Sequence, residues 1–236
     1  MAADDLPGPV VTFLNVLGID WPYLNEDQVY EFSRLVREFG QAVEQTHQDA
    51  TATVANFADA YKGSSTQALQ SGWSKLSGTH VTEIVDGCGI LADALEVMAG
   101  FVIAQKAEAV VQLVAMAAEF VADQAAAVAT FGLAEAAVPV IIEAGKALMD
   151  TLKQQIVQAI VGDVIEAAAK PLFAKVESMV AGLDWSASAT GSIGAGTGFS
   201  IDFEVAQTRV ATMQAHAATM RGHAQTLNSG LAGLSF

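Results

Sequence analysis

The side chains best suited to metal binding or nucleophilic chemistry are four histidines and one cysteine: His47, His80, His216, His223 and Cys88. No histidine belongs to a recognisable pattern of metal ligands at three- or four-residue spacing, so we expect no metal site. His216 and His223 lie seven residues apart on one expected helix, where we expect solvent-facing or interface roles. Cys88 lies on an apolar helix face without a basic neighbour, which predicts a buried structural thiol.

No combination of residues in the sequence matches a catalytic motif. The glycine-rich stretch 191–198 lacks the Lys-Ser/Thr ending of a phosphate-binding loop, and no strand precedes it. Acidic side chains recur every few residues, as on the solvated face of an amphipathic helix, so Glu83 and Asp86 are not expected to form an acid–base pair. No Gly-x-Ser-x-Gly elbow and no catalytic Cys–His setting is present. We therefore predict a protein that is not an enzyme and binds no cofactor; an enzyme with an unrecognised site is the weakest hypothesis.

The composition limits the partners of the chain. Its 236 residues include 26 acidic and 11 basic side chains, for a formal net charge of −15. Nucleic-acid binding needs clustered Lys and Arg, so nucleic acid is not an expected partner. Apolar residues make up 52% of the chain, too many for a disordered acidic tail. The mean hydropathy of +0.38 is high for a soluble protein and raises the question of a membrane segment.

The sequence argues against a signal peptide and a membrane span. The first basic residue is Arg34, whereas a cleavable signal begins with a basic region. A spanning helix needs about 18 nearly uninterrupted apolar residues. Charges interrupt the apolar stretch 91–165 every few residues, as on the wet faces of long helices: Asp93, Glu96, Lys106, Glu108, Glu119, Asp123, Glu135, Glu143, Lys146, Asp150, Lys153 and Asp163. A soluble helical bundle is favoured, and alanine-rich helices lining an oligomeric pore are the other interpretation.

The first half of the chain predicts a helical hairpin. Residues 1–22 form a short helix or irregular lead-in. Asn25 is a good N-cap, with Gln28 at the capping-box position, for an amphipathic helix that runs to about Tyr61. Gly63 then breaks the chain and Ser64 caps a second helix. A turn this short makes the two helices antiparallel neighbours.

The second half predicts further helices around a linker. The second hairpin helix continues to about residue 130, softened but not ended by glycines such as Gly78. Pro139 begins another helix through Ile165, which Pro171 kinks or divides. The predicted fold is therefore all-α, with a helical domain 1–182, a Gly/Ser linker 183–200 and a C-terminal helical segment 201–236. On this segment a heptad-like apolar seam is expected at Ala206, Val210, Met213, Ala217, Met220, Ala224, Leu227, Leu231 and Leu234. Such a helix must fold back on the first domain, pair with another chain or belong to an incomplete module.

The hairpin turn carries a resemblance to a known family. It reads Tyr61-Lys62-Gly63-Ser64, followed by Trp73, and resembles the Trp-x-Gly turn of the small helical-hairpin substrates of type VII secretion in actinobacteria and relatives. Tyr61 stands where the tryptophan usually is. The lead-in Trp21-Pro22 and the acidic start of the first helix resemble a larger branch, the N-terminal helical domains of secreted polymorphic toxins, similar to the mycobacterial outer-membrane channel and necrotising toxin protein. The resemblance covers about residues 8–180.

This resemblance implies a non-enzymatic secretion substrate or targeting domain. Its hairpin would pair with a small WXG-type helical protein, and the complex would dock on the type VII secretion ATPase. Export would take it from the cytoplasm to the envelope or exterior without a signal peptide, with or beside a toxin. The turn motif comprises Tyr61, Gly63, Ser64 and Trp73. The partner-interface candidates are Phe32, Phe39, Val54, Phe57, Val210, Met213, Met220 and Leu227.

Other interpretations of these segments stay open. The interface candidates on the hairpin are equally well placed to form the core of the chain itself. Residues from Ile201 onward resemble the first helix of a second, smaller module of the same secretion class. The Tyr-x-x-x-Asp spacing of family export signals occurs at Tyr23 and Asp27, before the first helix, where we interpret it as chance. A membrane-active, pore-forming or scaffold protein that uses the helices within 91–180 is the alternative function, with membrane contact less favoured than protein partners.

Overall fold

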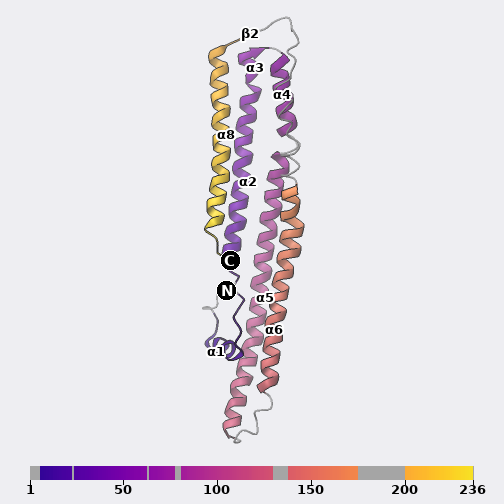
Figure 1. Ribbon diagram of the computed structural model, residues 1–236, viewed down its shortest axis with the longest axis vertical. Coiled ribbons are helices and arrows are strands. Elements are labelled where there is room, and N and C mark those ends of the chain that lie inside the picture. The colour runs from indigo at the N-terminus through magenta and orange to yellow at the C-terminus, as the bar shows by residue number, and fades with distance from the viewer. Residues whose placement is uncertain are drawn as a thin grey trace. The chain divides into compact units, whose positions relative to one another are not determined.

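The fold is dominated by helices. The computed structural model describes residues 6–22, 24–62, 64–77, 81–129, 138–174 and 200–235 (Figure 1). Its helices are α1 (Gly8–Leu17), α2 (Glu26–Ala55), α3 (Phe57–Ala60), α4 (Ser64–Leu76), α5 (Thr82–Ala129), α6 (Val138–Ala159), the π-helix η3 (Ile160–Ala169) and α8 (Phe203–Ala232). Within the described residues the strands are two-residue segments, β1 (Tyr61–Lys62) and β2 (Ser200–Ile201). The all-α prediction is confirmed.

The chain forms two compact units. Unit 1 comprises Met1–Glu31, Ala94–Glu166 and Leu234–Phe236, and unit 2 comprises Phe32–Asp93 and Ala167–Gly233. The boundaries fall inside α2, α5 and η3, so single helices contribute to both units. The division 1–182, 183–200 and 201–236 expected from the sequence stays a prediction.

Unit 1 is built around α1, the later part of α5, and α6. Phe13 of α1 is 1% exposed, and its ring lies 5.6 Å from the ring of Phe120 on α5. A Cβ atom at Gly145 of α6 would lie 2.9 Å from Leu17 Cδ1, so glycine is what lets α1 approach α6 this closely. Gly18 ends α1 with a φ of 65°, a conformation that glycine adopts without steric cost.

Unit 2 contains the helical hairpin. The buried residues of α2 include Val36, Val43 and Ala50, each seven residues apart, which confirms the predicted amphipathic face. Opposite this helix lies the start of α5, where a Cβ atom at Gly40 would lie 3.0 Å from Cys88 Cβ. Cys88 is 3% exposed, as predicted for a structural thiol, and burial raises the pKa of its thiol.

The helix boundaries depart from the prediction in two described places. The first hairpin helix ends at Ala55, and a turn at Asn56 separates it from α3, so it does not reach Tyr61 as one helix. The second hairpin helix is described as α4, which ends at Leu76, and α5, which begins at Thr82; residues 78–80 lie outside the described residues, so its continuity there stays a prediction. Gly78, which lacks the side chain that favours helix, falls between them, outside the described residues. The helix that begins at Val138 changes to π-helix at Ile160, ahead of Pro171, and nothing in the sequence pattern predicted the change. Most of the predicted linker, residues 183–199, also lies outside the described residues.

Candidate partner-binding site

The predicted turn motif lies at one end of unit 2, and only part of it is described. The backbone of β1 pairs antiparallel with β2, with Tyr61 opposite Ile201 and Lys62 opposite Ser200. The segment that leads into α8 therefore meets the hairpin at its turn. Gly63 and the side chains of Tyr61 and Ser64 lie outside the described residues.

Trp73 is the described member of the turn motif, and it ties α4 to α2. Its indole Nε1 donates a hydrogen bond to Thr51 Oγ1 at 2.9 Å. Its ring stacks on His47 with centroids 5.4 Å apart and an interplanar angle of 16°. His47 Nε2 also lies 2.6 Å from Ser77 Oγ, just beyond α4. Burial lowers the pKa of His47, which favours the neutral ring in this stack.

The predicted interface residues differ in their exposure. Val54 is 3% exposed and belongs to the core of unit 2, whereas Phe32, Phe39 and Phe57 are half-buried. Val210 on α8 is 48% exposed. Met213, Met220 and Leu227 are half-buried.

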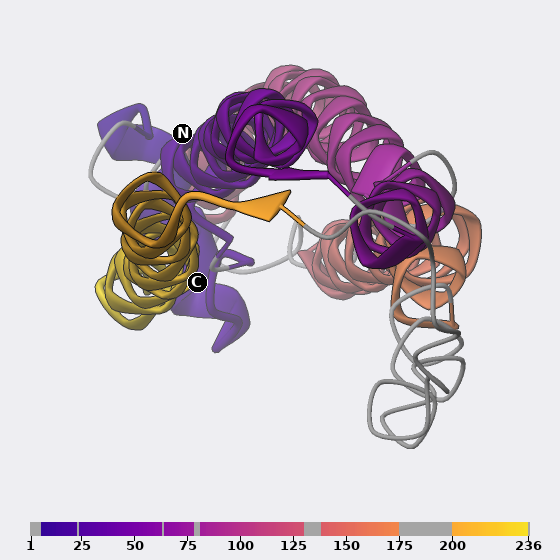
Figure 2. The ribbon, with the colours of Figure 1, turned by 90° about the horizontal axis from the view of Figure 1, so that it is seen from above.

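Two of these candidates meet at a hollow between α2 and α8. Phe39 and Leu227 line an open hollow of about 190 Å³, together with Leu35, Ala42 and His223. Helix α8 lies beside the unit 2 part of α2 in both views (Figure 1, Figure 2). Of the placements foreseen for the C-terminal helix, the structure shows the one in which it folds back on the hairpin.

Two threonine–histidine pairs connect α8 to α2. Thr46 Oγ1 lies 2.9 Å from His223 Nε2, and Thr53 Oγ1 lies 3.2 Å from His216 Nε2. Both threonines are buried, and their seven-residue spacing equals that of the histidines. An interface role for the histidines is confirmed. Thr46 and Thr53 were missed, although the shared seven-residue spacing could have indicated them.

The line of α8 that faces α2 is one residue away from the predicted apolar seam. Continuing the seven-residue step from the two histidines reaches Gly230, where a Cβ atom would lie 2.8 Å from the Leu35 methyl groups. The seam residues Val210, Ala217 and Ala224 are exposed. The predicted seam therefore does not pack as a whole against α2, and its use for pairing with another chain stays a prediction.

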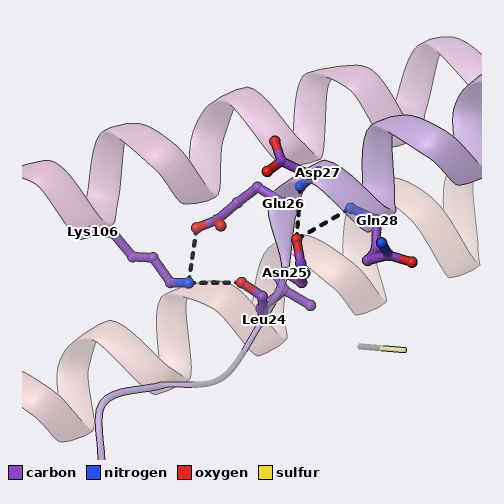
Figure 3. A network of polar contacts seen from close by, with 6 residues as sticks. All are labelled: Leu24, Asn25, Glu26, Asp27, Gln28 and Lys106. Atoms are coloured by element: carbon purple, nitrogen blue, oxygen red, sulfur yellow. Dashed lines mark hydrogen bonds and ion pairs between the residues drawn. The ribbon is translucent and has the colours of Figure 1, made fainter. Parts of the chain in front are cut away.

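A buried ion pair fixes the start of α2 in unit 1 (Figure 3). Lys106 Nζ on α5 lies 2.8 Å from Glu26 Oε1 and donates a hydrogen bond of 2.8 Å to the Leu24 carbonyl oxygen. The two side chains are 1% and 3% exposed. The expectation that Lys106 lies on a wet helix face is wrong, because Glu26 and the Leu24 carbonyl compensate its burial.

The same corner confirms the predicted N-cap. Asn25 Oδ1 accepts hydrogen bonds from the backbone N–H groups of Asp27 at 3.1 Å and Gln28 at 3.3 Å (Figure 3). Burial by itself would raise the pKa of Glu26, but hydrogen bonds and the charge of Lys106 outweigh it and hold this pKa below its ordinary value. Glu26 therefore stays ionised at neutral pH.

Among the described residues, metal-binding clusters are absent and one helix segment is apolar enough to span a membrane. They hold no group of three or more His, Cys, Asp or Glu side chains able to bind a metal ion. Among them one helix segment, Thr82–Ala125, is long and apolar enough to cross a membrane by length and composition alone, and 44% of its most apolar window is buried. The expectation that charges interrupt every such window is therefore too strict.

The comparisons with known proteins identify the family. A family model described as a WXG100 like domain matches residues 3–161, more than half of the chain. The match spans the elements from α1 to α6 and excludes α8. No curated protein and no solved structure gives a significant match. The chain therefore belongs to the WXG100-like domain family.

Proposed function

We propose that this protein is a type VII secretion substrate or targeting domain that pairs through its hairpin with a small WXG-type helical protein. Family membership supports a type VII secretion-related helical protein with protein–protein interactions. The observation that carries the pairing is the row of half-buried aromatic residues along the hairpin, Phe32, Phe39 and Phe57, beside the fully buried Val54. Half-buried aromatic side chains retain apolar surface that a partner can cover.

The pair then docks on the secretion ATPase and leaves the cytoplasm without a signal peptide, for the envelope or the exterior. The likeness of the lead-in and long alanine-rich helices to polymorphic-toxin domains extends the proposal to a toxin effector that the domain carries or accompanies. The protein itself acts through helix pairing and not through catalysis.

Co-expression with a small WXG-type protein tests this function. We expect a heterodimer by size-exclusion chromatography with light scattering. Phe39→Glu places a charge on the half-buried face and should abolish the pairing, whereas Gln41→Glu, at an exposed position of the same helix, should not. Elution of the two proteins as separate monomers would refute the proposal.

A membrane-active protein is the second candidate, favoured by one observation. The apolar segment Thr82–Ala125 has large apolar side chains on its surface: Val97 is 66%, Val111 70% and Val121 61% exposed. A helix of this length and apolar composition with exposed valines is compatible with contact to a membrane. Dye release from liposomes at micromolar protein is the expected result for this candidate, and intact liposomes would remove it.

A further inference from the structure

Helix α8 is long but shallowly attached. It has 30 residues, none of which is buried, and its surface includes Phe203 at 75% and Val210 at 48% exposure. Its interior amide groups are satisfied within the helix, so beyond the backbone pairing of β1 with β2 just before it, its attachment to unit 2 depends on side-chain contacts. Because apolar burial supplies most of the stability of a packed helix, α8 is held weakly for its length.

Regularly spaced contacts join α8 to α2, two of them polar and one apolar. His216 and His223 reach Thr53 and Thr46, and Gly230 lies against Leu35. Arg209, one further seven-residue step away, has a buried Nε without a hydrogen-bond partner among the described residues. A neutral hydrogen bond adds little net stability, and an unsatisfied buried donor is destabilising. These contacts therefore fix how α8 is aligned along α2, but they add little to the free energy that holds it there.

Both α8 and α2 keep apolar surface that their contact with each other does not cover. On α8, Val210, Ala217 and Ala224 of the predicted seam are exposed. On α2, Phe39 and Ala42 border the hollow of about 190 Å³. Interiors of proteins are normally packed without such space, so an occupant with larger apolar side chains would fit this face better than α8 does.

We propose that α8 is a displaceable strap, which covers the face of α2 that a helix of the small partner takes in the complex. This inference rests on the proposed function and adds which face of the hairpin is used and what blocks it in the free protein. Because the family match ends at residue 161, α8 lies outside the matched domain whose α2 face it covers.

Charge and shape define the partner helix that this face accepts. The unit 2 part of α2, residues 32–55, contains three acidic residues and two arginines, whereas α8 contains one glutamate and two arginines. Glu38 borders the hollow beside Leu35 and Phe39. The fitting partner is therefore an amphipathic helix with large apolar side chains and no acidic residue on its docking face.

A disulfide between α2 and α8 can lock the strap in place. A Cβ atom at Gly230 would lie 3.4 Å from Leu35 Cγ, so Leu35→Cys with Gly230→Cys brings two Cβ atoms near the separation of about 3.5–4.5 Å that disulfides require. The substitution Cys88→Ala removes the natural thiol. The opened variant is His216→Ala with His223→Ala. Its matched control, Gln207→Ala with Gln214→Ala, changes two exposed residues of α8 at the same seven-residue spacing.

The probe is a fluorescein-labelled synthetic peptide of residues 202–235, titrated with each full-length variant and followed by fluorescence anisotropy. We expect the opened variant to bind the peptide at least tenfold more tightly than the matched control, because its own α8 competes less. The oxidised locked variant should bind no peptide, and dithiothreitol should restore its binding. In co-purification, the opened variant should retain more of the small partner than the matched control does, and the oxidised locked variant should retain none.

Three outcomes would overturn the strap. They are equal peptide binding by the locked and reduced forms, no gain for the opened variant over its control, or equal partner pairing by the locked and opened forms. If the peptide results hold while no variant pairs with the partner, the proposed pairing fails instead, and the accessible face of α2 remains established.

Discussion

Helices α1 and α8 show that the length of a helix does not measure its attachment. In unit 1, α1 has only ten residues, but Val10, Phe13, Leu14 and Leu17 are all buried. In unit 2, α8 has 30 residues and none is buried. The short helix is held by ring packing and a glycine contact, whereas the long one meets α2 through two threonine–histidine pairs, the close approach of Gly230 to Leu35 and the hollow lined by Leu227, and it also contacts α3. Few buried contacts lower the local stability of an element, so α8 should open more readily than α1.

The largest expected effect tests how firmly α1 is attached. Phe13→Ala removes a fully buried ring in contact with Phe120, so we expect unfolding free energy in urea to fall by about 4 kcal/mol. Val16→Ala, at a position that is 50% exposed, should change it by less than about 0.5 kcal/mol. A loss below 1 kcal/mol for Phe13→Ala would mean that α1 is no better attached than α8.

The next effect concerns the ion pair at the start of α2. Lys106→Met leaves the buried Glu26 carboxylate without its cation and should cost about 3 kcal/mol in urea unfolding. The double variant Lys106→Met with Glu26→Gln should recover part of this loss. Arg37→Met, which removes an ion pair to Asp93 with side chains 37% and 70% exposed, should cost less than about 1 kcal/mol. If Lys106→Met and Arg37→Met lowered the unfolding free energy equally, burial would not explain the cost of breaking the Lys106–Glu26 ion pair.

Acid should act on the two units in different pH ranges. The pKa of His47 in unit 2 is lowered from its ordinary 6.5, so the unfolded chain takes up this proton first and stability falls as the pH drops below about 6.5. The pKa of Glu26 in unit 1 is lowered from 4.5, so its contribution is present above that value and is lost as the pH falls further.

Thermal unfolding between pH 8 and 3 separates these contributions. His47→Gln should flatten the first decrease and Glu26→Gln the second, each without affecting the other. If both variants follow the wild-type profile throughout, other groups govern the acid response.

The smallest effect on global stability is expected for α8. His216→Ala with His223→Ala should lower unfolding free energy by less than about 1 kcal/mol per site, since each removes one half-exposed hydrogen bond. Hydrogen exchange should nevertheless show α8 amides exchanging at least tenfold faster in this variant, with those of α1 unchanged. Unchanged exchange in α8 would show that the two histidines do not hold it.

Local patterns in the sequence predicted most of the elements. The periodicity of Val36, Val43 and Ala50 gave the buried face of α2, and Asn25 gave its start. These features depend on neighbours within a few residues, which the sequence places next to one another. The turn at Asn56 was missed because the apolar three- and four-residue spacing continues across it, from Val54 to Phe57.

Contacts between distant segments could not be predicted in the same way. Lys106 was expected in water because only the fold brings it to Glu26 and Leu24. The rotation of α8 by one residue was missed because the hydrophobic pattern favours the Val210 seam, whereas matching spacings of threonine and histidine decide the observed face. A polar pair has a well-defined geometry in the folded chain, but its two residues leave only a weak pattern in the sequence.

Because α8 lies late in the chain, the ribosome synthesises it after the hairpin. About 125 residues separate Leu76, the end of α4, from Phe203, and at roughly 5–20 residues per second their synthesis takes on the order of 6–25 seconds. During that interval the hairpin can close while nothing yet competes for the α2 face. A partner already present in the cytoplasm would meet the nascent hairpin before the strap exists, so the order of translation would favour the hetero-complex over self-closure.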